Sequence, residues 1–212
     1  AYEDYFSTLI RSWRSEWNRG DFPFYWVQLA AYKEPNAEPL EDNGWASICD
    51  QQRRCLKLPN TGMAVTTDIG EAKDIHPRNK VDVGKRLALW ALEKQYEIDL
   101  PAHSGPLYRS HTVEGNKFLI TFSETGSGLM AGHKSGLDDA VEVNEPLKRF
   151  QIAGTDRNWK WAEAKIVSGN RIEVLHPDIL SPVAVRYAWS GNPAGANLYN
   201  KEGLPASMFT TE

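Results

Sequence analysis

Hydrophobic residues in the first part of the chain follow the two spacings that distinguish an amphipathic helix from a buried strand. The first group recurs at steps of three and four residues and comprises Tyr2, Tyr5, Phe6, Leu9, Ile10, Trp13 and Trp17. This spacing predicts an amphipathic helix that ends near Gly20. The next run, residues 22–30, is apolar apart from Gln28 and rich in aromatic residues. It predicts a strand buried on both faces, which is typical of a parallel sheet.

The same two patterns alternate as far as residue 100. A short helix is expected from about Trp45 to Leu56, and a second buried strand over residues 62–69. A further helix is expected to begin near Lys80, with Asn79 as its N-cap and Asp82 in its first turn. The order helix, strand, helix, strand, helix predicts an α/β fold.

Beyond about Pro101 the hydrophobic pattern changes to a period of two residues. Phe118, Ile120 and Phe122 share one face of an expected strand. Residues 114–116 and 168–170 each carry a glycine beside asparagine between alternating runs, as hairpin turns do. The sequence therefore predicts an α/β portion at residues 1–100 and a mainly antiparallel β-rich domain at residues 101–212.

Two buried parallel strands are too few for an independent α/β domain, because they leave sheet edges and apolar faces uncovered. The chain begins with Ala1, and its first residues are already amphipathic. We therefore expect the α/β portion to be incomplete, with its remaining strands supplied by an N-terminal segment of the same protein.

Charge and cysteine content exclude several classes of function. The formal net charge is −4, and no run of like charges favours nucleic acid or an anionic membrane surface. No apolar segment approaches the roughly 18 residues of a membrane-spanning helix. Cys49 and Cys55 are expected on one helix, about 9 Å apart, which is beyond disulfide reach. Without further cysteines or clustered histidines, they are interpreted as core residues and not as zinc ligands.

The loop after the second predicted strand, residues 70–79, is the candidate reactive segment, because ligands bind beyond the carboxyl ends of parallel strands. It contains Asp74, His76 and Pro77 just before a helix. A fixed histidine with a carboxylate two residues away is suited to act as general base for a hydroxyl nucleophile. The alternative is that Asp74 and His76 only cap the loop and the helix, and the spacing alone favours this alternative slightly.

A catalytic role for His76 requires a nucleophile. None of the 13 serines has glycine two positions before it, the arrangement that relieves crowding at a sharp strand-to-helix turn. The reacting hydroxyl is therefore not expected in this chain.

Many segments resemble bacterial sialate O-acetylesterases of the SGNH hydrolase superfamily, in the order of that family and over nearly the whole chain. The most specific is Asp74-Ile75-His76-Pro77-Arg78-Asn79-Lys80. The other matching segments are residues 5–14, 21–30, 61–65, 68–70, 83–89, 104–106, 150–154, 185–189, 197–200 and 203–206. The resemblance implies a partial SGNH-type three-layer parallel sheet, followed by the antiparallel β region.

By this resemblance, the nucleophilic serine and the oxyanion donors lie upstream of Ala1, and His76 is the catalytic base. Asp74 matches the Asp of the family's Asp-Ile-His-Pro pattern. The wider superfamily spaces the acid as Asp-x-x-His, where this sequence has Lys73. The orienting acid is therefore Asp74 or, as the second candidate, Asp68 at the strand end. Arg78 is a candidate for binding an anionic sugar carboxylate, with solvation at the helix start as the alternative.

The resemblance implies hydrolysis of O-acetyl esters on sialic acid or related sugars, without metal or organic cofactor, by a secreted or periplasmic protein. The chain alone is then expected to be inactive. The alternative is a non-catalytic carbohydrate-binding or structural β module. Trp45, Trp159 and Trp161 lie near predicted turns and are candidates for stacking on sugars, whereas Trp13, Trp17, Trp90 and Trp189 are expected in the core.

Overall fold

The computed structural model describes residues 1–39 and 43–212, and its first half has the predicted order of helices and strands. The elements are α1 (Tyr2–Trp17), β1 (Phe24–Val27), α2 (Gly44–Arg54), the 3₁₀ turn η1 (Cys55–Lys57), β2 (Thr61–Ala64) and α3 (Lys80–Lys94). The α/β class is thus confirmed. Both strands are shorter than the apolar runs that predicted them. Past their ends, side chains replace sheet pairing, as where the Thr66 hydroxyl donates to the Gln28 carbonyl at 2.7 Å.

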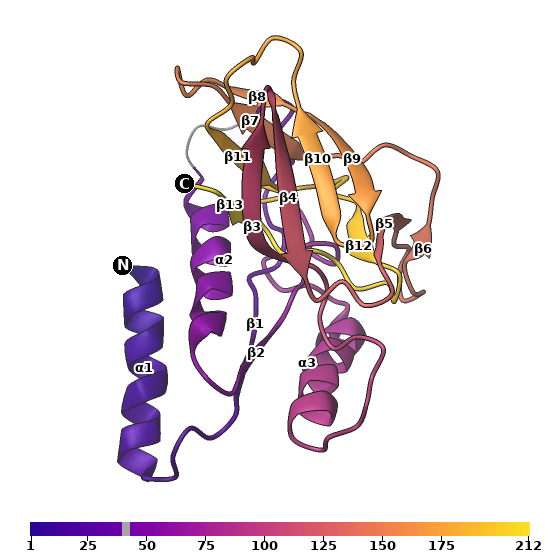
Figure 1. Ribbon diagram of the computed structural model, residues 1–212. Helices are drawn as coiled ribbons and strands as arrows, with labels where there is room; N and C mark the ends of the chain where they lie inside the picture. The colour runs from indigo at the N-terminus through magenta and orange to yellow at the C-terminus, as the bar shows by residue number, and fades with distance from the viewer. Residues whose placement is uncertain (40–42) are drawn as a thin grey trace.

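Strands β1 and β2 run parallel, with Phe24 opposite Thr61 and Val27 opposite Ala64. Helices cover both faces of this pair (Figure 1). Phe6 of α1 packs its ring against Trp26 on one face. On the other face, Trp90 of α3 lies so close to Gly62 that a Cβ there would be 2.5 Å from the indole. Among the described residues β1 and β2 pair only with each other, so the SGNH-type three-layer parallel sheet implied by the resemblance is not evident, and the parallel sheet has two strands.

The ends of the helices follow local sequence signals. The Asn79 side chain accepts a hydrogen bond from the Asp82 backbone N–H at 3.0 Å, which confirms Asn79 as the N-cap of α3. Helix α1 ends at Trp17, before the expected Gly20, because Asn18 adopts a left-handed conformation with φ of 45°.

The second half consists of strands β3 (Leu107–Glu114), β4 (Lys117–Ser123), β5 (Leu129–His133), β6 (Val141–Glu142), β7 (Phe150–Ala153), β8 (Trp159–Trp161), β9 (Glu163–Ser168), β10 (Arg171–Leu175), β11 (Ala184–Tyr187), β12 (Leu198–Asn200) and β13 (Phe209–Thr210). They form sheets of order β3-β4-β10-β9, β13-β11-β7-β8 and β12-β5-β6, and all the pairings between them are antiparallel. The turns predicted at 114–116 and 168–170 connect β3 to β4 and β9 to β10.

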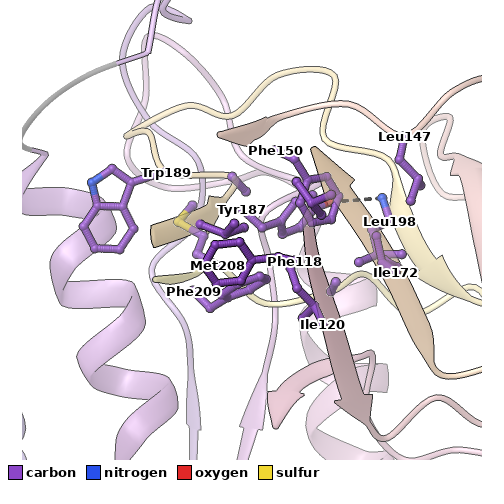
Figure 2. Close-up of a cluster of buried hydrophobic side chains, with 14 of the residues drawn as sticks. Phe118, Ile120, Leu147, Phe150, Ile172, Tyr187, Trp189, Leu198, Met208 and Phe209 are labelled. Carbon is purple, nitrogen blue, oxygen red and sulfur yellow. Dashed lines mark hydrogen bonds between the residues drawn. The ribbon is translucent and has the colours of Figure 1, made fainter. Parts of the chain in front are cut away.

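The main hydrophobic core lies between these sheets (Figure 2). At its centre the Tyr187 ring stacks on Phe209, and its hydroxyl accepts a hydrogen bond from the Leu198 backbone N–H at 2.9 Å. Ala46 and Cys49 of α2 belong to the same cluster. The β region and α2 therefore share one core. Cys49 and Cys55 are both buried and not disulfide-bonded, in agreement with the sequence interpretation.

Helix α1 departs from the expectation of a fully packed apolar stripe. Trp13 is 48% exposed and Trp17 is 62% exposed, so their predicted core placement is wrong for the chain as it stands. The predicted core placement of Trp90 and Trp189 is confirmed, because both are nearly buried. Within the described part of the chain, no helix is both long and apolar enough to cross a bilayer.

Candidate active site

The loop from residue 65 to Asn79 leaves the carboxyl end of β2 and enters α3, where the sequence placed the reactive segment. It lies against the segment that follows β1. Glu71 forms a single parallel bridge with Tyr32. At Gly70 a Cβ atom would come 2.1 Å from the Ala31 carbonyl oxygen, so this close approach of two backbones requires glycine.

Asp74 and His76 form a local hydrogen-bonded unit in this loop. One carboxylate oxygen, Asp74 Oδ1, accepts from the His76 backbone N–H at 2.9 Å and lies 3.0 Å from the His76 ring Nδ1. A side chain that binds the backbone two residues ahead is the Asx-turn arrangement. The hydrogen bonds from the His76 backbone and ring hold the pKa of Asp74 below its ordinary value. The carboxylate is thus ionised at neutral pH and fixes the orientation of the imidazole.

The His76 side chain is 83% exposed, and its second nitrogen, Nε2, makes no hydrogen bond to the described residues. A histidine whose Nδ1 is held by a carboxylate presents Nε2 to a reacting hydroxyl and has its imidazolium form stabilised when it accepts a proton. The Asp74–His76 pair therefore has the geometry that general-base chemistry on a hydroxyl requires, with the His76 side chain open to solvent.

Asp68, the second candidate for orienting His76, is engaged elsewhere. It forms a two-pronged ion pair with the Arg86 guanidinium of α3, at 2.6 and 2.8 Å, with both side chains almost fully buried. The Tyr199 hydroxyl of β12 donates to the same carboxylate at 3.3 Å. Asp74 is therefore the carboxylate that contacts the ring, and Asp68 anchors the start of the loop.

Arg78 projects into solvent beside the histidine. Its side chain is 88% exposed, and its guanidinium lies 3.6 Å from the Glu71 carboxylate. The Arg78 backbone N–H also donates to Glu71 at 2.9 Å. The guanidinium is loosely paired and accessible to a ligand, while Glu71 fixes the backbone of the loop.

The far end of the loop is fixed by a buried ion pair between the two halves of the chain. Lys134, directly after β5, contacts Asp82 in the first turn of α3 at 2.8 Å, and both side chains are 6% exposed. Burial by itself raises the pKa of Asp82, but hydrogen bonds from Lys134 and Asn79 outweigh it, and the pKa lies below its ordinary value. The β region therefore contacts the loop's supports at both ends.

Sequence reasoning did not find Arg86, Lys134 or Tyr199. The partners of Lys134 and Tyr199 are distant in sequence and are brought together only by the packing of the β region on α3. Arg86 carried a signal, since it lies four residues before Trp90 on the buried face of α3. A charged residue on an apolar helix stripe indicates a buried partner.

The tryptophans proposed to bind sugars are each engaged within the protein. The Trp45 indole N–H donates to the Ala30 carbonyl at 3.0 Å, and that of Trp161 to the Ala37 carbonyl at 2.9 Å. The Trp159 ring lies 3.7 Å from the Arg186 guanidinium carbon. All three are half-buried. Trp45 packs against Tyr32, which bridges to Glu71 of the His76 loop, but none of the three has a hydrogen bond or ring contact with Asp74 or His76.

Comparison with known proteins identifies a similar solved structure. Neither a protein-family model nor a curated protein matches the chain. Among solved structures, a carbohydrate acetylesterase from Xanthomonas citri is similar, with 39% sequence identity and a TM-score of 0.87. The match covers 100% of this chain and 46% of that protein. The chain thus spans less than half the length of the esterase that it resembles.

Proposed function

We propose that this chain is the C-terminal, histidine-bearing portion of a serine carbohydrate esterase. The observation that carries the proposal is the Asp74–His76 pair, held at the carboxyl end of a parallel strand in a chain whose fold is similar to that of a carbohydrate acetylesterase. The finer assignment, a sialate O-acetylesterase of the SGNH superfamily that acts on sialic acid or related sugars, rests on the sequence resemblance.

The proposed mechanism uses His76 as the proton carrier. A serine hydroxyl from the preceding segment attacks the acetyl carbonyl, and His76 Nε2 accepts the hydroxyl proton. Asp74 stabilises the resulting imidazolium. When the tetrahedral intermediate collapses, His76 returns the proton to the sugar oxygen that leaves. Water then attacks the acetyl-serine with His76 again as base, and acetate is released.

The exposed surface of the α/β portion supports a preceding segment as the partner. One stripe of α1 is exposed and consists of residues four positions apart: Tyr5, Leu9, Trp13 and Trp17. Helix α1 itself lies at the outer side of the molecule (Figure 1). The strands β1 and β2 have no further partner in the described part of the chain. An apolar helix face beside an unpaired strand edge is the surface that additional parallel strands would cover. We accordingly propose residues 1–100 as part of a larger α/β domain, followed by a β domain at 101–212.

The test is ester hydrolysis by the longer parent protein. We expect the parent to hydrolyse p-nitrophenyl acetate, and His76→Ala to lower kcat by about 10²- to 10⁴-fold, the usual contribution of a general base. His176→Ala is the matched control, because His176 also has an aspartate two residues away, Asp178, and lies in the β region. It should leave turnover unchanged.

Unchanged turnover in His76→Ala would remove His76 from the mechanism. If the parent binds acetylated glycans but does not hydrolyse the ester, the chain belongs to a non-catalytic carbohydrate-binding protein, the alternative class.

A further inference from the structure

A cavity of about 330 Å³ opens where the carboxyl ends of β1 and β2 meet the loops of the β region. From the α/β portion it is lined by Ala31, Thr67 and Gly70, and Gly70 begins the His76 loop. From the β region it is lined by residues 132–134, Val143, Glu145, Lys148, residues 192–197 and Tyr199. We call it the junction pocket. Its volume lies at the lower end of the range for small-ligand sites, which begins at about 300 Å³.

The wall of the junction pocket is tied to both halves of the chain. The Asn192 side-chain amide donates to the Lys33 carbonyl at 2.7 Å, and the Tyr32 backbone N–H donates to the Gly191 carbonyl at 2.8 Å. These hydrogen bonds hold the loop before β12 against the segment after β1. The segments that form the pocket wall are therefore hydrogen-bonded to one another, and the pocket is a fixed part of the fold.

Two largely buried residues of the wall each have a side-chain oxygen without a hydrogen-bond partner among the described residues. Thr67 is 8% exposed, and its hydroxyl makes no hydrogen bond to them. Asn192 is 9% exposed, and its side-chain oxygen is likewise unbonded, although its nitrogen is used. Neither oxygen belongs to the fully buried atoms without a partner, so both are open to solvent and can hydrogen-bond a ligand that carries hydroxyl groups.

The charged groups of the junction pocket balance one another. Lys148 and Glu145 form an ion pair at 2.5 Å at the rim. Asp68 and Lys134 also line the pocket but are occupied by Arg86 and Asp82. His133 also lines the pocket and, together with the stronger effect of Lys148, lowers the pKa of Glu145, so it too has an acidic neighbour. The pocket thus offers mainly hydroxyl and amide contacts to a ligand.

We propose that the junction pocket binds a neutral, hydroxyl-rich sugar unit of the ester substrate, with Thr67 and Asn192 as its recognition groups. The identification of the ligand as part of the substrate rests on the proposed esterase function. In this proposal the β region has a role in substrate binding, because it completes a binding site at the base of the loop that carries His76.

The test is direct binding, measured on the 212-residue chain by ¹H–¹⁵N NMR with two probes, methyl β-D-glucopyranoside and N-acetylneuraminic acid. The neutral glycoside should cause saturable shifts at Thr67, Asn192 and Lys148. Thr67→Val removes the hydroxyl at constant shape and should weaken binding by about three- to tenfold, as expected for one hydrogen bond. Ala194→Trp, at an exposed position of the rim, should abolish binding by filling the opening.

Lys160→Ala is the control, since it breaks an exposed ion pair with Asp178 outside the pocket and should leave binding unchanged. Shifts that are absent, that lie elsewhere, or that are insensitive to Thr67→Val and Ala194→Trp would overturn the proposal. Tighter binding of N-acetylneuraminic acid than of the glycoside would overturn the assignment of a neutral ligand.

This outcome is separable from that of the esterase proposal, because p-nitrophenyl acetate contains no sugar. If the parent hydrolyses it through His76 while the chain shows no sugar-dependent shifts, the pocket assignment fails and the esterase stands. If the shifts occur but the parent is inactive towards the ester, the catalytic assignment fails and the junction pocket stands as a sugar site.

Discussion

The two halves of the chain bury their hydrophobic residues to different extents. In the β region, residues 101–212, large aromatic side chains such as Phe118, Phe150 and Phe209 are fully buried. In the α/β portion, residues 1–100, the aromatic residues Tyr5, Trp13, Trp17 and Tyr96 are among the exposed large hydrophobic residues, whereas those of the described β region are all aliphatic.

This difference indicates that the core shared by the β region and α2 is closed, while one face of the α/β portion is suited to be covered. Aromatic residues supply large apolar areas at interfaces, so a row of them on α1 favours a protein partner. The candidate active site also depends on both halves of the chain. The Asp74–His76 pair is exposed on the α/β side, and its loop is held from the β side by Tyr199 and Lys134.

The largest expected effect is on the free energy of unfolding, and it distinguishes buried from exposed aromatic residues. Phe118→Ala in β4 should lower the free energy of unfolding by about 3–5 kcal/mol, because it leaves a cavity in a closed core. Trp17→Ala on α1 should cost less than about 1 kcal/mol in this chain, because the side chain is already largely exposed. Urea unfolding followed by far-UV circular dichroism measures both. Equal losses would show that the two halves are packed alike.

The next effect concerns the junction between the halves. Arg86→Met should destabilise the chain by about 3 kcal/mol, because Asp68 would remain as an unpaired buried carboxylate. Lys160→Met, which breaks the exposed pair with Asp178, should cost less than about 1 kcal/mol. The same unfolding measurement applies. A cost for Arg86→Met as small as that of the control would mean that Asp68 is solvated when the pair is broken.

A smaller effect is the pH dependence of the Lys134–Asp82 contact. The pKa of Asp82 is lower in the folded protein than its ordinary value. Its contribution to stability is therefore present above the unfolded-state pKa, about 3.9, and is lost as the pH falls through the folded-state pKa. Lys134→Met should be less stable than the wild type at neutral pH, and the difference should shrink in acid. A difference that does not change with pH would exclude this origin.

The sequence predicted the elements that depend on local patterns. The N-cap Asn79, the hairpin turns and the alternating face of Phe118, Ile120 and Phe122 are set by neighbours within a few residues, and all are found. The contact between Asp74 and His76 was one of the two predicted alternatives, because the partners are only two positions apart in the sequence.

What the sequence did not predict depends on long-range packing. The Asp68–Tyr199 contact joins residues 131 positions apart, and the junction pocket is assembled from segments of both halves. The exposure of Trp13 and Trp17 was missed for a related reason. Helical periodicity identifies an apolar stripe, but it does not show whether the surface that covers the stripe belongs to the same segment.

The central claim is that His76 acts on a hydroxyl supplied by another segment of the protein. The most direct measurement is p-nitrophenyl acetate hydrolysis after this chain is mixed with the separately purified preceding segment of the parent protein. We predict no turnover by either component alone, turnover that saturates at one-to-one stoichiometry in the mixture, and none when the chain carries His76→Ala. Hydrolysis by the chain alone at the rate of the mixture, or full turnover with His76→Ala, would contradict the account.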